Sequence, residues 1–370
     1  MSDTGDVFRE AIQNFLSPIR HLLEDERVTE VMINGPSEIW IEIAGKVQKT
    51  DAKFRDEDSL RAAINNIAQS VGRVVNDAEP RLDARLPNGY RIHAVLPPCA
   101  RKGTTVAIRK FSAVQMSFKD YVKIGALTVD TAQFLDISMK LGKNILVSGG
   151  TGSGKTTLLG VLCERIPPGQ RIIVIEDASE LKVDYEHAVF FETRLADDHG
   201  RKAVTMQDLL KSSLRLRPDR IIVGEVRAAE ALELIQAMNT GHKGCLGTVH
   251  ANSSFDALIR LEALAQGADG KISERALRQQ ISSAIDIVVQ VSRYPDGSRR
   301  IAEISEVRGF TADGSYDVVQ IYSMSRMLRS ADGKLTGKLQ PTGELPVFMD
   351  EIEDNQIPFA RTKFQKPQAA

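Results

Sequence analysis

A glycine-rich stretch followed by lysine and threonine is the part of this sequence best suited to chemistry. The pattern Gly-x4-Gly-Lys-Thr runs from Gly149 to Thr156, after the apolar run 145–147 and before the helix-compatible run 157–166. Glycines let successive N–H groups turn around a phosphate, and the start of the following helix adds partial positive charge. The pattern and both flanks disfavour a ligand-free turn. We therefore predict a nucleotide site made by Gly150, Thr151, Gly152, Ser153, Gly154, Lys155, Thr156 and Thr157.

Within this pattern the lysine and the threonine have separate tasks. Lys155 is expected to reach the β- and γ-phosphates, and the Thr156 hydroxyl is expected to bind Mg²⁺. ATP and Mg²⁺ are therefore the ligands that the sequence predicts.

Three carboxylates follow the predicted strand 171–175, namely Glu176, Asp177 and Glu180. Beside a metal-bound triphosphate, one carboxylate can take a proton from the attacking water and others can order the water molecules on the metal. A solvated acidic turn, or a helix start with capping carboxylates, is the alternative interpretation. The sequence leaves open which of the three is the base.

Two more polar residues follow two further apolar strands. Glu225 comes after the predicted strand 220–223, where P-loop proteins usually carry a Walker B aspartate, and His250 comes after the predicted strand 245–249. A histidine at a strand end can sense the γ-phosphate by hydrogen bonding, although a lone histidine is more often structural. For Glu225, a surface ion pair with Arg227 is the alternative. Parallel strands end at the same edge of a sheet, so these side chains are expected near the glycine loop.

The elements that must position these residues follow from the hydrophobic periodicity. From residue 143 onward strands and helices alternate, which argues for a parallel α/β sheet. The predicted helices of this part are 128–141, 157–166, 205–218 and 228–238. The preceding part predicts an α+β domain with helices 7–23 and 56–70 and strands 28–33, 38–43, 81–86, 90–96 and 104–109.

The composition excludes several classes of protein. The 370 residues are 42% hydrophobic and 26% charged with a net charge of -1, which is typical of a globular protein and gives no general attraction to nucleic acid or anionic lipid. The three cysteines are far apart in sequence and form neither a disulfide framework nor a zinc motif, as expected in a reducing compartment. No secretion signal or apolar run of roughly 18 residues is evident. We therefore expect a cytoplasmic protein that meets a membrane only through a partner.

Direct binding to nucleic acid is not expected, because no patch combines aromatic and basic residues. One basic cluster is expected to be a solvated or intersubunit face: Lys211, Arg215, Arg217 and Arg220.

Together, the four segments resemble the bacterial secretion and pilus traffic ATPases of the type II/type IV secretion superfamily. Residues 149–157 correspond to the Walker A motif of that family, 175–181 to its Asp box, 224–227 to its atypical Walker B motif and 240–252 to its His box. Further segments are similar to the branch that drives Tad-type pili, which is close to the conjugative and type IV secretion ATPases: 16–19, 28–36, 83–93, 107–111 and 343–346. The tetracysteine zinc module of the type II secretion branch is missing.

The resemblance implies an α/β fold in which a RecA-like P-loop ATPase domain, residues 126–312, follows a smaller α+β N-terminal domain, residues 1–110. A linker at 111–125 joins the two, and a C-terminal segment with a tail spans 313–370. Members of the family form homo-hexameric rings, and the domains of each subunit rearrange as nucleotide is turned over.

The resemblance also implies roles for particular residues. Glu180 corresponds to the catalytic glutamate, Glu225 to the Walker B acid and His250 to the His-box sensor. Mg²⁺ at Thr156 would be held with Glu225 and Glu176 or Asp177 through water. Candidates for arginines of the N-terminal part that reach a nucleotide, in the same or a neighbouring subunit, are Arg91 and Arg109. The alternative for both arginines is a solvated or ion-paired side chain.

The function implied is a hexameric ATP-hydrolysing motor for pilus assembly or retraction, or for protein secretion, which works on an inner-membrane platform protein. Three alternatives remain at this point: a conjugation or type IV secretion ATPase, a nucleotide-dependent scaffold with little turnover, and a DNA translocase. The last is disfavoured by the neutral charge.

Overall fold

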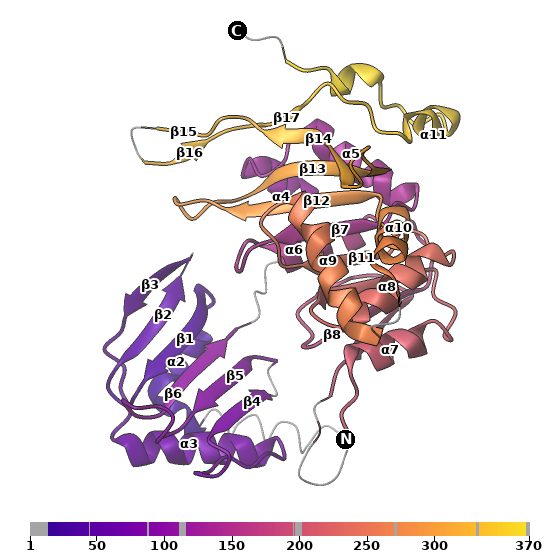
Figure 1. The fold of residues 1–370 in the computed structure, drawn as a ribbon. Coiled ribbons are helices and arrows are strands. Elements are labelled where there is room, and N and C mark those ends of the chain that lie inside the picture. Colours follow the sequence, from indigo (N-terminus) through magenta and orange to yellow (C-terminus); the bar gives the residue numbers. More distant parts are fainter. Residues whose placement is uncertain are drawn as a thin grey trace. The chain divides into compact units, whose positions relative to one another are not determined.

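The computed structural model describes residues 14–367 apart from 44, 87–88, 111–115, 195, 197–201, 270–271 and 331–332. The chain divides into two compact units, one made of Met1–Val114 with Leu195–Ala203 and the other of Gln115–Arg194 with Val204–Ala370. Figure 1 shows both units as ribbons, each with its own sheet.

The smaller unit is built on a six-stranded antiparallel sheet in the order β3-β2-β1-β6-β5-β4. Its strands are β1 Val28–Asn34, β2 Ile39–Ile43, β3 Lys46–Lys49, β4 Arg81–Arg85, β5 Arg91–Val95 and β6 Thr105–Arg109. Its helices are the short η1 Ser17–Ile19 and α2 Arg20–Glu24, and the longer α3 Glu57–Ser70. A capping box starts α3, because the Asp56 carboxylate accepts a hydrogen bond from the Ser59 N–H at 2.8 Å.

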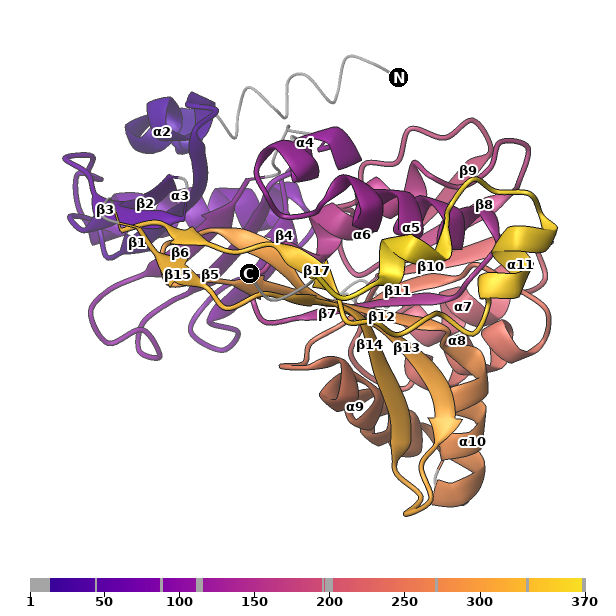
Figure 2. The same cartoon turned by 90° about the horizontal axis from the view of Figure 1, so that it is seen from above.

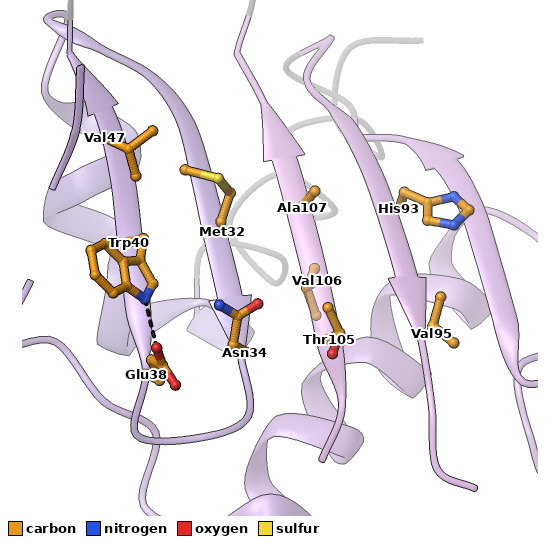
Figure 3. A pocket seen from close by; sticks show the side chains of 10 residues that line it. All are labelled: Met32, Asn34, Glu38, Trp40, Val47, His93, Val95, Thr105, Val106 and Ala107. Atoms are coloured by element: carbon orange, nitrogen blue, oxygen red, sulfur yellow. Dashed lines mark hydrogen bonds between the residues drawn. The ribbon is translucent and has the colours of Figure 1, made fainter. Parts of the chain in front are cut away.

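Successive side chains of a strand point to opposite faces, so this sheet has one face covered by the core and one open face. Ile33 and Ile39 are fully buried in the same core cluster as Leu60 of α3. Side chains of the opposite face, Met32 and Trp40 among them, border an open hollow of about 480 Å³ (Figure 3).

The larger unit contains a nine-stranded sheet in the order β17-β14-β13-β12-β7-β11-β10-β8-β9. The six strands from β12 to β9 are parallel to their neighbours, and β13, β14 and β17 extend the sheet in antiparallel fashion. The parallel strands are β7 Ile145–Gly149, β8 Ile172–Glu176, β9 Ala188–Glu192, β10 Arg220–Val226, β11 Leu246–Val249 and β12 Ile287–Arg293. The others are β13 Arg299–Phe310, β14 Tyr316–Met324 and β17 Leu339–Pro341, with a separate small hairpin of β15 Leu328–Arg329 and β16 Leu335–Thr336.

Helices cover both faces of this sheet, so the inner parallel strands are buried on two sides, whereas the edge strand β9 is only partly covered (Figure 2). One face carries α4 Phe118–Lys123, α5 Val129–Lys140 and α6 Lys155–Cys163. The other face carries α7 Met206–Ser213, α8 Glu230–Asn239, α9 Ser254–Asp269 and α10 Glu274–Ala284. Within β7, Ile145 and Val147 face the first layer while Leu146 faces the second.

The C-terminal residues complete the first of these layers. After α11 Met349–Asp354, the last helical element among the described residues is η2 Arg361–Phe364. Phe348 stacks on Phe134 of α5 with ring centroids 5.7 Å apart, and Phe364 meets the same ring edge-on at 5.8 Å. Part of the region predicted as a C-terminal segment, 313–370, thus belongs to the main sheet and its core.

Most of the predicted strands and helices are confirmed, and the differences have local causes. The helix predicted over 205–218 ends at Ser213. Proline disfavours a helical conformation in the residue before it, and Arg217, which precedes Pro218, has a φ of +55°. Residues 7–13 of the helix predicted over 7–23 lie outside the described residues, and its described part forms η1 and α2 around Pro18.

The predicted linker 111–125 is covered only in part. Residues 111–115 lie outside the described residues, whereas Phe118–Lys123 forms α4. Tyr121 of this helix is buried in the core of the larger unit.

Arg220 is not part of a basic surface cluster, contrary to the sequence-based expectation. Only 2% of this residue is exposed, and its guanidinium donates to the Met139 carbonyl at 2.8 Å and to the Gln170 side chain at 2.6 Å. The long side chain enters the fold at the amino end of β10, where Gly244 leaves room for it.

Among the helices described, none combines the length and apolar character needed to cross a membrane.

Candidate active site

The glycine loop that follows β7 has the backbone conformation that its sequence predicts. Gly152 and Gly154 have φ angles of +67° and +98°, in the left-handed region that favours glycine. Gly149 is required for space, since a Cβ there would lie 2.4 Å from the Val291 carbonyl oxygen. No other residue type would fit these positions without strain.

The loop leads directly into the N-terminus of α6. Gly154 is the N-cap residue and no side chain caps the helix, so side chains do not compete for its first N–H groups. The Lys155 ammonium group donates to the carbonyl oxygens of Gly149 and Gly150 at 3.1 and 3.2 Å. The Ser153 hydroxyl donates to the Gly150 oxygen at 2.8 Å. This combination of N–H groups, helix dipole and ammonium group suits a phosphate.

Parallel pairing brings the predicted site segments of the larger unit to one edge of the sheet. Val249 of β11 pairs with Ser148 of β7, so His250 lies level with Gly149, where the glycine loop begins. Val223 of β10 pairs with Ile175 of β8, which places Glu225 beside the end of the Asp-box strand. The carboxyl ends of four adjacent strands therefore lie side by side, in the order β8, β10, β11 and β7.

Glu176 is the buried carboxylate of the site. It is 4% exposed, and one of its oxygens accepts hydrogen bonds from the N–H groups of Glu180 at 2.9 Å and Leu181 at 2.8 Å. Burial raises the pKa of Glu176 to about 7, although the two N–H bonds oppose that increase. Gly224 makes room for this side chain, since a Cβ there would lie 2.9 Å from the Glu176 Cγ. Glu176 thus positions the backbone of Glu180, whose own side chain is half-buried.

Glu225 and Asp177 share an arginine. Arg227 forms an ion pair with Glu225 and lies 3.3 Å from the Asp177 carboxylate. The pairing of Glu225 with Arg227, which the sequence suggested as the alternative to a catalytic role, is thus present. Glu230, which the sequence analysis did not single out, accepts from the N–H groups of Arg227 at 2.5 Å and Ala228 at 2.8 Å and so holds the backbone of this arginine.

His250 is exposed at the end of β11. The residue that follows it is held from β12, the strand on the other side of β7, because the Gln290 side chain donates to the Ala251 carbonyl at 3.3 Å. One residue before Val249, the Thr248 hydroxyl donates to the Gly224 carbonyl at 2.7 Å and ties β11 to β10. The histidine is therefore presented on an anchored segment.

Arg91 and Arg109 belong to the smaller unit. They lie opposite each other on β5 and β6, and Arg91 forms an ion pair with Asp83 at 2.9 Å. The predicted contact of either arginine with a nucleotide stays a prediction.

Sequence reasoning missed two arginines beside the glycine loop. Arg299 donates from Nε to the Gly152 carbonyl at 2.8 Å, and Arg293 lies next to the same glycine. Arg293 is the last residue of β12 and Arg299 the first of β13, so the two flank the turn that joins these strands. The signal that could have found this hairpin is Pro295-Asp-Gly297, a turn sequence between two β-rich runs.

No protein side chains gather as a ready metal centre in the part of the chain that the structure describes, where no group of three or more His, Cys, Asp or Glu residues could hold a metal ion. The Thr156 hydroxyl at the start of α6 is the kind of oxygen donor that Mg²⁺ prefers, and such sites usually complete the ion's shell with phosphate and water. The residues present therefore fit an ion that arrives with a nucleotide.

Comparison with known proteins gives consistent matches over most of the chain. The family model described as "Type II/IV secretion system protein" matches residues 13–323. The chain is 36% identical over 311 residues to a putative conjugal transfer protein of Mycobacterium tuberculosis, with 82% of this chain and 87% of that protein covered. It is 34% identical over 334 residues to the type IV secretion system protein VirB11 of Brucella suis, with 82% and 92% covered.

A solved structure with the same fold is that of the pilus retraction motor PilT with bound ADP. The TM-score is 0.55 at 18% identity, with 96% of this chain and 90% of that chain covered, which supports the fold alone. The predicted fold class, an α/β P-loop domain preceded by a smaller α+β domain, is confirmed.

Proposed function

Because this chain belongs to the type II/IV secretion system protein family, we propose that it is an ATP-hydrolysing motor of a cell-envelope secretion machine. Its relatives in Mycobacterium tuberculosis and Brucella suis are named for conjugal transfer and type IV secretion, which favours a conjugation or type IV secretion ATPase over a motor for Tad pili. The observation that carries the proposal is the glycine loop, whose left-handed glycines run into the uncapped start of α6 at the same sheet edge as the acidic residues.

In the proposed reaction, water attacks the γ-phosphorus of ATP and the bond to the β–γ bridging oxygen breaks. The loop N–H groups and Lys155 hold the phosphates, and the Glu180 carboxylate accepts the proton of the water. Glu176 keeps Glu180 in place through the N–H bonds at 2.9 and 2.8 Å. Glu225, steadied by Arg227, would order water near the phosphates. Mg²⁺ bound at Thr156 would neutralise phosphate charge.

Steady-state phosphate release from ATP by the purified chain tests this proposal. We expect Lys155→Ala to lose nucleotide binding, whereas Glu180→Gln and Glu225→Gln should bind ATP but release phosphate at least about 100-fold more slowly. Glu186→Gln is a matched control, because it removes the same charge from an exposed side chain. Equal rates for Glu180→Gln and this control would overturn the assignment of the base.

We also propose that the active form is a homo-hexamer that works with an inner-membrane partner. In such a ring Arg91 and Arg109 would approach a nucleotide and His250 would respond to the γ-phosphate. Phosphate release measured against protein concentration, with the mass of the assembly determined in parallel, tests this step. Activity that stays proportional to protein while the mass remains that of a monomer would exclude a need for the ring.

A scaffold that binds ATP and assembles with little turnover is the second candidate. The ion pair of Glu225 with Arg227 favours it, since a paired carboxylate is less available for catalysis. A ring that binds ATP and releases no phosphate, even with its membrane partner present, would support the scaffold.

A further inference from the structure

The turn between β12 and β13 is a rigid element at the glycine loop. Tyr294 and Ser298 close it with a backbone hydrogen bond of 2.8 Å, and Asp296 accepts from the Ser298 hydroxyl at 2.6 Å. A second oxygen of Asp296 accepts from the Leu335 N–H at 2.8 Å, which fastens the turn to the small hairpin of β15 and β16. The turn is therefore held at its base and at its tip.

Strand pairing sets the place of this turn. Val291 of β12 pairs with Gly149 of β7, so β12 passes the point where the glycine loop begins. Two residues later Arg293 pairs with Arg299, the first residue of β13. The two strand ends that flank the turn thus carry paired arginines at the loop.

Both arginines lie beside the glycines of the loop that would surround a phosphate. Arg299 Nε donates to the Gly152 carbonyl at 2.8 Å, and its Cδ lies 3.5 Å from the position of a Cβ on Gly154. Nη1 of Arg293 lies 3.5 Å from the position of a Cβ on Gly152. These contacts span 147 residues of sequence between Gly152 and Arg299.

The charge of Arg299 is not neutralised by this contact. Its partner is a backbone carbonyl, which carries no net charge, and the arginine is exposed. A guanidinium group has five N–H donors in a planar fork that matches phosphate oxygens, so one bond to Gly152 leaves four for a ligand.

We propose that Arg299, with Arg293 beside it, binds the polyphosphate of the nucleotide in the glycine loop. The proposal rests on the proposed function and adds two phosphate-binding residues to the loop itself. Arg299 would bond to Gly152 through Nε and to phosphate oxygens through its terminal nitrogens, which joins the turn to the nucleotide. Arg299 has two alternative roles: it stabilises the loop without contacting the ligand (a brace), or it packs against the nucleoside.

Binding of two probes by the full chain, ADP and inorganic tripolyphosphate, separates these roles. We expect Arg299→Ala to weaken the binding of both probes about tenfold, because a charge-assisted bond to phosphate is lost. Arg299→Lys should recover part of this loss, since lysine keeps the charge without the fork. Arg215→Ala is the matched control, because Arg215 is exposed and precedes β10, at the opposite edge of the sheet from the loop.

Each outcome of these binding measurements either supports or overturns the phosphate-binding role of Arg299. Weaker ADP binding with unchanged tripolyphosphate binding would overturn the proposal in favour of a nucleoside contact, and unchanged binding of both probes with a lower Tm would leave only a brace. Should Arg299→Ala not fold, Arg293→Ala, which keeps the bond to Gly152, must weaken both probes for the proposal to stand. Failure of the proposed function looks different, because the wild-type chain would then bind neither probe, or Lys155→Ala would bind both as well as the wild type.

Discussion

Replacing Glu176 by glutamine should remove a pH-dependent penalty on the stability of the larger unit. Burial disfavours the charged form of this carboxylate and raises its pKa from the usual 4.5 to about 7. Between these two values the folded protein keeps a proton that the unfolded chain has lost. Below pH 4.5 Glu176 therefore does not lower the free energy of unfolding. As the pH rises above 4.5 this free energy falls, and it reaches its lowest value above pH 7.

The size of this penalty follows from the two pKa values. Each pKa unit corresponds to about 1.4 kcal/mol, so the free energy of unfolding loses at most roughly 3 kcal/mol between pH 4.5 and pH 8 through this group. Glutamine is neutral at every pH and keeps an oxygen that can accept from the N–H groups of Glu180 and Leu181. The variant should consequently gain stability over the wild type as the pH rises.

Calorimetric unfolding of both proteins at pH 5, 6, 7 and 8 measures the effect. For a unit of this size 1 kcal/mol corresponds to about 2–4 °C in Tm, so the gap in favour of Glu176→Gln should widen by several degrees, at most about 10 °C. Glu186→Gln again controls for the loss of one negative charge at an exposed position. A gap that is the same at pH 5 and pH 8 would refute the argument that Glu176 is held in a desolvated site.

Three further substitutions probe the site. Gly224→Ala puts a Cβ 2.9 Å from the Glu176 Cγ and should lower the free energy of unfolding by about 1–3 kcal/mol, as measured by urea denaturation. Gly152→Ala forces alanine to a φ of +67° and should reduce ADP binding in calorimetry, with a stability loss of about 1 kcal/mol. Arg227→Ala breaks the ion pair with Glu225, and because the arginine is half exposed the change in urea stability should stay below about 1 kcal/mol. A larger loss would mean that the pair holds the strand end together.

Much of the fold could be predicted from the sequence because its signals are local. The order Gly-x4-Gly-Lys-Thr after an apolar run specifies a strand, a turn with left-handed glycines and a helix start, and β7, the loop and α6 follow it. The apolar runs that end at Glu176 and Glu225 likewise became the buried strands β8 and β10. Elements without such a motif, among them α9, α10, β12 and β13, were not predicted.

The environment of each charged side chain could not be predicted in the same way. Glu176, Asp177 and Glu180 stand within five residues and look alike in sequence, yet only Glu176 is buried, because Gly224 of the adjoining strand makes room for it. Arg220 has the sequence context of a surface cluster but fills a gap left by Gly244.

By itself, the sequence determined the glycine loop, the secondary structure around it and the family, since backbone conformation and apolar periodicity depend on residues close together in the chain. Tertiary structure alone decided which carboxylate is desolvated and that Arg299 reaches Gly152. Burial and charge contacts depend on which strands are neighbours, and in this sheet β12 comes to lie beside β7, with β13 next to it, only after more than a hundred residues.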